Sequence, residues 1–264
     1  SHNRRAGRNR RINGVNLKLL SYNIRFGGRE RRAEIAEVIN AVSPDVVVFQ
    51  EASAPEVIEY LSEKCRMPFH AARAKYSVGF ISRIAVAHYE WHNPARAHHS
   101  FLEIQLAADS EMRIFGLHLK ARFSKWSERQ RHREIKALLE SIERHQDGFH
   151  VIVGDFNTLA PNEVFHLDLM PLWIRALIWI SGRDIRRDTI QTVLDAGYLD
   201  GFRALYPDDK GHTFPVWRPH VRLDYIFLPT RCRDRLKDCR VVKEPETTKR
   251  ASDHFPLLGE FELS

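Results

Sequence analysis

Residues 150–158 read HVIVGDFNT, an apolar run that ends in a glycine followed by polar residues. A run of this length, rich in valine and isoleucine and bounded by turn-forming residues, is typical of a buried β-strand. Asp155 and Asn157 come directly after the run, where the strand reaches the surface. The pattern recurs along the chain and predicts a fold made of short, buried strands.

Seven further apolar runs are bounded by turn residues and are also predicted to be strands. They are Leu17–Tyr22, Val46–Gln50, Val78–Ser82, Phe101–Leu106, Met112–Leu119, Leu223–Leu228 and Leu257–Phe261. Ile35–Val42 and Ile135–Ile142 have the apolar spacing of amphipathic helices, and Ser127 with Gln130 forms a capping-box pattern at the start of the second. Strands interspersed with helices indicate an α/β protein whose sheets pack together under a cover of helices.

A chain of 264 residues, 43% apolar and 28% charged, has the composition of an ordinary globular protein and the length to bury a full core. No internal repeat, low-complexity stretch or long linker interrupts the sequence after residue 14. Residues 15–264 are therefore predicted to form a single domain behind a basic tail, residues 1–14.

The formal net charge of +7 comes from 41 lysines and arginines against 34 acids. Five of the arginines, and no acid, lie in the first eleven residues; without them the balance is 36 against 34. Such a tail can contact nucleic acid or anionic lipid. A tag remnant with a linker is the competing explanation, because the sequence opens on Ser1-His2 without a methionine.

The three cysteines form no CxxC pair and no Cys/His cluster, which argues against a disulfide framework and a structural zinc site. A reducing compartment follows most simply, so a cytoplasmic location is expected. No apolar run approaches the roughly 20 residues of a membrane span, and no signal-peptide pattern opens the sequence. A span ahead of Ser1 is left open.

Polar residues suited to metal binding or proton transfer stand at or near the ends of the predicted strands. They are Asn23, Glu51, His118, Asp155, Asn157, Asp224, Asp253 and His254. Each alone is explained by a turn, a cap or core packing. Together their oxygens are the ligands that Mg²⁺ prefers, and the histidines can transfer protons or face phosphoryl oxygens. The set fits metal-assisted hydrolysis of a phosphate ester.

The motifs SYN, FQE, HL, GDFN, RLDYIF and SDHFP occur in this order between Leu17 and Leu263. In order and spacing the chain resembles the endonuclease/exonuclease/phosphatase superfamily, with the deoxyribonuclease I-like fold. The resemblance implies a four-layer α/β sandwich, in which two mostly antiparallel β-sheets lie face to face and are flanked by helices. It also implies a Mg²⁺ site at one end, where Mn²⁺ substitutes.

By this resemblance Glu51 is the principal metal ligand, Asn23 lies beside it, and Asp253 is a further metal or water ligand. Arg25 stands where repair enzymes of the family often carry an aspartate, so no metal ligand is assigned there. The apurinic-site endonucleases have a Pro-Asn pair where this chain has GLHLK, which disfavours abasic-site repair.

The resemblance also implies catalytic roles. Asp155 would activate or orient the attacking water, and Asn157 would hold the phosphate. His254 would face the phosphoryl oxygen or the leaving group, and His118 would be a second histidine on the phosphate. Asp224 would orient the His254 ring, so a carboxylate within about 3.2 Å of that ring is expected.

The segment 118–133 carries six lysines and arginines against one acid, with Phe123 and Trp126 interleaved. Cations for phosphates and aromatics for bases are typical of a nucleic-acid-binding surface. Lys120, Arg122 and Lys125 are therefore expected to contact substrate. For the arginines beyond position 129, a substrate-facing and a solvated helix face remain equally open.

Two other segments bear on the substrate. Residues 169–180, LMPLWIRALIWI, are too short to span a bilayer and favour a buried or docked helix, with lipid contact through their tryptophans as the weaker alternative. Phe214 or Trp217, in HTFPVW, is expected to stack on a base or sugar; ordinary loop packing explains them equally well.

The function that these observations favour is a monomeric, Mg²⁺-dependent phosphodiesterase acting on nucleic acid, as an endonuclease, exonuclease or DNA-end-processing enzyme. The alternative is a sphingomyelinase-like phosphatase or phosphodiesterase acting on lipid or inositol phosphates. A non-catalytic binding module is disfavoured, because no predicted site residue is replaced by an inert one.

Overall fold

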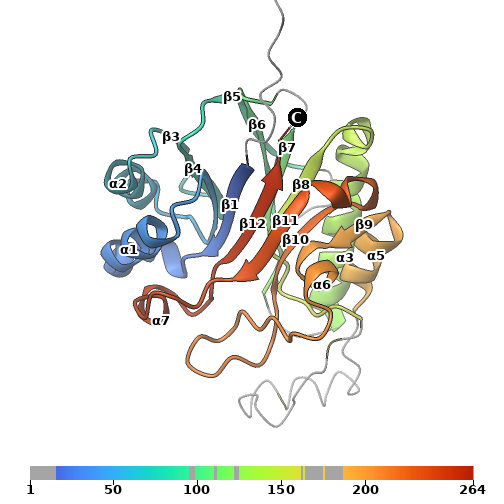
Figure 1. Cartoon of the computed structure of the whole chain (residues 1–264). Helices are drawn as coiled ribbons and strands as arrows, with labels where there is room; N and C mark the ends of the chain where they lie inside the picture. The colour runs from blue at the N-terminus through green and yellow to red at the C-terminus, as the bar shows by residue number, and fades with distance from the viewer. Residues whose placement is uncertain are drawn as a thin grey trace, which may run out of the picture.

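The computed structural model describes residues 16–94, 99–109, 112–121, 125–161, 163, 175 and 187–263. Two β-sheets of six strands each lie face to face, with helices outside them (Figure 1). Helices α1 (Arg32–Val42) and α2 (Pro55–Cys65) pack on the first sheet, and α3 (Lys125–Ser141) and α5 (Asp188–Asp195) on the second. The predicted four-layer α/β sandwich is confirmed.

The first sheet has the order β11-β12-β1-β2-β4-β3. Its strands are β1 (Asn16–Asn23), β2 (Val46–Gln50), β3 (Phe69–Ala71), β4 (Val78–Ser82), β11 (Leu236–Val241) and β12 (Leu257–Glu262). β1 and β2 are parallel, with Asn23 opposite Gln50, and the other pairs are antiparallel. The carboxyl ends of β1 and β2 therefore meet at one edge of the sheet, which brings Asn23 next to Glu51.

The second sheet has the order β5-β6-β7-β8-β10-β9. Its strands are β5 (Val86–His92), β6 (Phe101–Leu106), β7 (Arg113–His118), β8 (His150–Asp155), β9 (Tyr198–Asp200) and β10 (Asp224–Pro229). Parallel pairing sets His118 opposite Asp155, and antiparallel pairing sets Asp155 opposite Asp224. Three polar residues thus lie side by side on neighbouring strands.

Two glycines permit close approaches on which the site depends. A Cβ at Gly116 would lie 2.6 Å from Cγ1 of Val48, so this glycine lets the two sheets approach each other. Gly154 has φ +149°, and a Cβ there would lie 2.0 Å from the carbonyl oxygen of Leu117. Only glycine fits that position, where β8 runs beside β7 one residue before Asp155.

Shorter helices complete the connections: η1 (Phe26–Arg31), η2 (Glu143–His145), α6 (Gly201–Leu205), η4 (Thr230–Arg235) and α7 (Thr248–Ala251). Among the residues that the structure describes, no helix is long and apolar enough to cross a bilayer. The predictions for the basic tail, for Arg122 and for residues 169–180 apart from Arg175 concern positions outside the described residues.

All eight predicted strands are present, and none of their ends differs from the prediction by more than one residue. The sequence patterns do not predict β3, β5, β9 and β11. β3 and β9 have three residues each, and most of the side chains of β5 are exposed, so neither length nor apolar content marks these strands.

The capping-box prediction is wrong. Helix α3 begins at Lys125, so Ser127 lies inside its first turn rather than ahead of it. Gln130 donates from Nε2 to Glu134 Oε1 at 3.2 Å, one turn further along the helix, instead of reaching back to a cap. The pattern fails because the helix already begins two residues before Ser127, so Ser127 does not stand at the cap position.

Candidate active site

The ends of five strands from both sheets meet at the candidate site. Register places His118, Asp155 and Asp224 on adjacent strands of the second sheet, while Asn23 and Glu51 follow parallel strands of the first. Residues that are far apart in sequence are brought together because parallel strands end at the same edge. The structure therefore assembles the polar strand-end residues that the sequence singles out.

Asn23 connects the two sheets. Its buried amide donates from Nδ2 to Asp155 Oδ2 at 2.9 Å and to Glu51 Oε1 at 3.3 Å, and its Oδ1 accepts a hydrogen bond from the backbone N–H of Arg25 at 3.0 Å. One amide nitrogen thus holds a carboxylate from each sheet. The carbonyl oxygen keeps a second lone pair, which is free to bind a cation.

Glu51 has a strained backbone. Its φ of +56° lies in the left-handed region, and Asn157 shares this feature with φ +52°. Glu51 Oε2 accepts a hydrogen bond from the backbone N–H of Phe26 at 2.6 Å. Left-handed conformations of residues other than glycine are concentrated at functional sites, where the surrounding structure compensates for the strain.

Asp155 and Asn157 are held by backbone contacts. Asp155 Oδ1 accepts from the Asn157 N–H at 2.9 Å, and Asn157 Nδ2 donates to the carbonyl oxygen of Leu119 at 2.9 Å. Burial raises the pKa of Asp155 to about 7; nearby Asp224 adds to the shift and His254 opposes it. Asp155 therefore binds a proton more readily than an exposed aspartate, as a group that accepts a proton from water must.

His254 forms the expected pair with Asp224. Ser252 Oγ donates to the carbonyl oxygen of Asn23 at 2.6 Å, which holds the His254 segment beside β1. His254 Nδ1 lies 2.9 Å from Asp224 Oδ2, and its Nε2 lies 3.9 Å from Asp155 Oδ2. Burial alone would lower the pKa of His254, but the carboxylates of Asp224 and Asp155 raise it to about 10. The ring is an imidazolium at neutral pH.

His118, unlike His254, is a neutral imidazole. Its Nε2 lies 3.8 Å from Asp155 Oδ2, on the strand next to β8. Burial, followed by the nearby rings of His99 and His254, lowers the pKa of His118 to about 3. Its Nδ1 has no hydrogen-bond partner among the described residues. The site thus holds one charged and one neutral imidazole, a division of roles typical of acid–base chemistry.

The residues present fit a divalent metal ion. Asp155, Asp224 and His254 offer ligand atoms that all lie within 4.8 Å of one another, while Asp224 Oδ2 and His254 Nδ1 are engaged with each other. The Glu51 carboxylate approaches the same Asn23 nitrogen that binds Asp155. Two carboxylates so close together favour a bound cation, and oxygen ligands favour Mg²⁺ over softer metals.

The negative charge of Asp253 is balanced by an ion pair with Arg25. Arg25 Nε lies 3.2 Å from Asp253 Oδ2, while the Arg25 backbone N–H binds Asn23. The sequence marks Arg25 only as a departure from a family pattern and does not reveal this ion pair. The only trace of it in the sequence is an arginine two residues after Asn23.

Of the two predicted aromatic residues, Phe214 lies beside His254 and Trp217 lies beside Phe214. The ring centroids of Phe214 and His254 are 4.8 Å apart, and Trp217 lies 6.3 Å from Phe214 with 67% of its surface exposed. Lys120 is half-buried just beyond His118, Arg122 lies outside the described residues, and the side chain of Lys125 is likewise not described.

The sequence leaves two alternatives for Arg131, a substrate-facing surface and a solvated helix face, and the structure shows neither. It is buried, and it donates to Glu128 Oε2 from Nε at 3.0 Å and from Nη2 at 2.8 Å, and to the carbonyl oxygen of Lys120 at 2.7 Å. Glu128 also accepts from Thr158 Oγ1 at 2.9 Å and from the Thr189 N–H at 3.0 Å. The pair ties α3 to the loops that follow His118 and Asp155.

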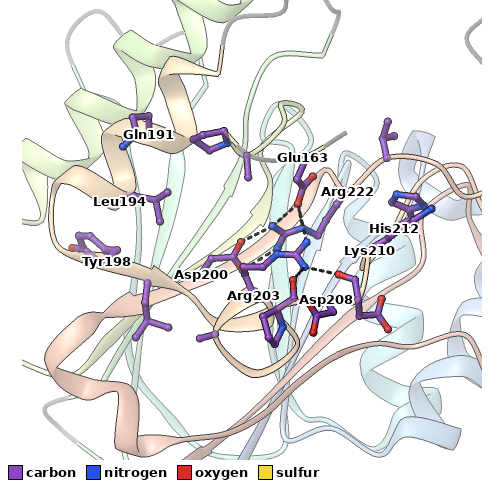
Figure 2. Close-up of a pocket in the computed structure, with 17 residues that line it drawn as sticks. Glu163, Gln191, Leu194, Tyr198, Asp200, Arg203, Asp208, Lys210, His212 and Arg222 are labelled. Atoms are coloured by element: carbon purple, nitrogen blue, oxygen red, sulfur yellow. Dashed lines mark hydrogen bonds and ion pairs between the residues drawn. The ribbon is translucent and has the colours of Figure 1, made fainter. Parts of the chain in front are cut away.

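A separate pocket of about 790 Å³ lies beside β9 and α6 (Figure 2). Arg222, at its wall, is fully buried and donates to both oxygens of Asp200 at 2.9 and 2.6 Å and to Glu163 at 2.5 Å. None of the sequence-predicted site residues lines this pocket. Arg222 anchors the segment that leads into β10 and Asp224.

Residues 20–254 match the model of the Endonuclease/Exonuclease/phosphatase family. Since the match spans most of the chain, the protein belongs to this family of enzymes, which hydrolyse phosphate esters and generally use a divalent metal ion. A comparison with curated proteins finds no match.

Solved structures share the fold over nearly the whole chain. The 3′ phosphatase NExo from Neisseria, bound to a product DNA hairpin, is 18% identical with a TM-score of 0.70, covering 93% of this chain and 99% of that one. An AP endonuclease from Archaeoglobus fulgidus is 17% identical with a TM-score of 0.70, covering 93% of this chain and 99% of that one. TDP2 of D. rerio, complexed with a single-strand DNA product, is 17% identical with a TM-score of 0.65, covering 94% of this chain and 99% of that one. At these identities the similarity shows the fold alone.

The Asp224–His254 hydrogen bond predicts coupled losses of activity. Asp224→Asn and His254→Ala act through one imidazole, so the double variant should be scarcely slower than His254→Ala alone. Steady-state rates of the three variants, measured at equal metal concentration, test this. Rate losses that multiply fully would show that the two residues act independently.

The buried Glu128–Arg131 pair predicts a large effect on stability. Arg131→Ala should lower the free energy of unfolding by about 3–5 kcal/mol, because it leaves Glu128 buried without its counter-charge. Arg133→Ala, an exposed arginine on the same helix, is the matched control and should change stability by less than about 0.5 kcal/mol. Urea unfolding followed by circular dichroism measures both; equal effects would contradict the prediction.

Proposed function

We propose that the protein is a Mg²⁺-dependent phosphodiesterase that hydrolyses phosphate esters of nucleic acid. The observation that carries the proposal is the contact of one amide, Asn23 Nδ2, with both Glu51 and Asp155. It puts a candidate metal-binding carboxylate next to a candidate water-activating one. Membership of the family supports the same chemistry.

Glu51 is the proposed principal ligand of the ion, with Asn23 Oδ1 and Asp253 beside it, and Mn²⁺ is expected to substitute for Mg²⁺. When bound, the ion supplies Lewis-acid polarisation of the phosphoryl oxygens. Arg25 holds Asp253 on its outer side and limits the net negative charge of this ligand set.

Asp155 is the proposed general base. Its raised pKa suits it to accept a proton from the attacking water, and Asn23 and Asn157 fix both of its oxygens. Asn157 is proposed to hold a phosphoryl oxygen through the second N–H of its amide, because the first is used by Leu119.

His254 is proposed to stabilise or protonate the leaving oxygen. Asp224 occupies Nδ1, so Nε2 of the imidazolium faces the centre of the site and can donate there. The neutral His118 is proposed to contact a second phosphoryl oxygen.

Nucleic acid is the proposed substrate class. The solved structures of this fold include an exonuclease and proteins that hold DNA products, and here a basic segment begins directly after His118. Phe214 contacts the His254 ring and Trp217 lies against Phe214, where a base or sugar would sit. The lipid alternative rests on His118 and on residues 169–180; only Arg175 of that segment is described, and a histidine facing the phosphate fits either substrate class.

Glu51→Gln tests the metal site. Turnover of single-stranded DNA should fall by about 100-fold or more and recover in part at high Mg²⁺, because the change removes charge and keeps the shape. Calorimetric titration with Mn²⁺ should show weaker binding. Glu56→Gln, an exposed glutamate on α2, is the matched control and should behave as wild type.

Full activity in excess chelator, or a Glu51→Gln variant that binds metal and turns over normally, would contradict the proposed site. The same assay run on plasmid DNA, 5′-tyrosyl DNA, inositol phosphates and sphingomyelin separates nucleic acid from lipid substrates.

The basic segment predicts a salt effect. Changing Lys120, Arg122 and Lys125 to alanine should weaken DNA binding irrespective of sequence and flatten the plot of log K against log salt by up to about three units. A variant that loses three other exposed cations, Lys64, Arg66 and Lys136, is the control and should keep the slope. An unchanged slope in the first variant would assign the segment to ordinary solvated surface.

A further inference from the structure

Two large aromatic side chains stand exposed at the candidate active site. Phe26 is 75% exposed, three residues after Asn23, and Trp217 is 67% exposed in the loop that precedes β10. Single exposed aromatics are common on protein surfaces and need no explanation by themselves. What distinguishes this pair is how its loops are attached.

Both loops are attached to Asp253. Arg25, next to Phe26, binds the Asp253 carboxylate at 3.2 Å. The backbone N–H of Val216, next to Trp217, donates to the carbonyl oxygen of Asp253 at 3.0 Å. Asp253 therefore anchors both aromatic loops, one through its side-chain carboxylate and the other through its backbone carbonyl oxygen.

The backbone at Arg25 and Phe26 is strained. Arg25 has φ 50° and ψ 114°, and Phe26 has φ 50°, which is unfavourable for a bulky residue. Hydrogen bonds from the site hold this shape: the Phe26 N–H donates to Glu51 Oε2 at 2.6 Å, and the Gly27 N–H to the Glu51 carbonyl oxygen at 3.0 Å. The result is a ring directed into solvent although a buried apolar cluster, which includes Ile24, lies two residues away.

A cation accompanies each aromatic residue, by contact for Phe26 and by sequence position for Trp217. The guanidinium carbon of Arg25 is 5.5 Å from the centroid of the Phe26 ring, a cation–π distance that restrains the ring. Exposed Arg218 follows Trp217 directly. Aromatic faces next to cations are what a flexible, charged strand of bases and phosphates needs.

We propose that Phe26 and Trp217 stack on two unpaired nucleobases, one on each side of the phosphate that is hydrolysed. Phe26 is the specificity residue on the Glu51 side of the site, and Trp217 on the His254 side. The pair selects single-stranded or frayed nucleic acid, because a base must leave its duplex partner to stack on a protein ring. This inference rests on the proposed nucleic-acid function.

Binding is measured first, without hydrolysis. Single-stranded oligonucleotides that carry 2-aminopurine at successive positions are titrated with the protein in chelator. Wild type should change the fluorescence at two positions; Phe26→Ala should abolish one signal and Trp217→Ala the other. Each should weaken affinity about 5- to 150-fold, the range of one lost stacking contact.

Two substitutions serve as controls. Phe69→Ala removes another exposed phenylalanine, on β3 at the far end of the sheet, where it pairs with Ser82, and should leave both signals unchanged. Phe26→Tyr keeps a stacking ring and should retain the signal. Phe26→Leu keeps apolar area without a ring and should lose it.

Removing the base then tests the contact itself. On an oligonucleotide with an abasic analogue at the Phe26 position, Phe26→Ala should cost nothing further. An equal loss on every oligonucleotide would overturn the inference and make Phe26 structural. Partitioning into sphingomyelin–phosphatidylserine vesicles that depends on Phe26 and Trp217, without a 2-aminopurine signal, would also overturn it.

Failure of the proposed function has a different signature. If wild type with Mg²⁺ leaves every nucleic acid intact while the 2-aminopurine signals still depend on Phe26 and Trp217, the stacking inference stands and the proposed reaction falls. If wild type cleaves single strands and neither variant alters binding, the reaction stands and the stacking inference falls.

Discussion

The hydrogen bond from Asn23 to Asp155, 2.9 Å long between residues 132 positions apart, joins the two sheets at the candidate site. Each partner ends a buried strand, and each strand is positioned by its parallel neighbour. The bond can form only when both sheets pack at the correct distance, which Gly116 permits. Because the same amide nitrogen also binds Glu51, the packing of the sandwich determines the spacing of the two carboxylates.

Burial gives the site its electrostatic character. Two imidazoles on the same side of Asp155 differ in charge because His254 has a hydrogen-bonded carboxylate, Asp224, whereas His118 has none of its own. Desolvation alone would make both rings neutral. The carboxylates thus decide which histidine carries a proton, and the Ser252–Asn23 hydrogen bond holds the His254 segment where it meets Asp224.

Elements outside the sheets support this arrangement from two directions. The buried Glu128–Arg131 pair braces the loops after β7 and β8, and Arg222 with Asp200 anchors the segment before β10. Asp253 attaches the loops that present Phe26 and Trp217. Buried ion pairs therefore support the site from below its exposed aromatic residues, and four of its residues, Arg25, Phe26, Glu51 and Asn157, have positive φ.

The sequence alone determines eight of the strands and names the polar residues at their ends, because short apolar runs and the residues that stop them are local features. It cannot reveal that Arg131 is buried, that Arg25 pairs with Asp253, or that Ser127 lies inside a helix, because burial and ion pairing depend on partners brought close only by sheet topology. Charge states follow the same rule: His118 and His254 are alike in sequence, and only their tertiary surroundings separate their pKa values.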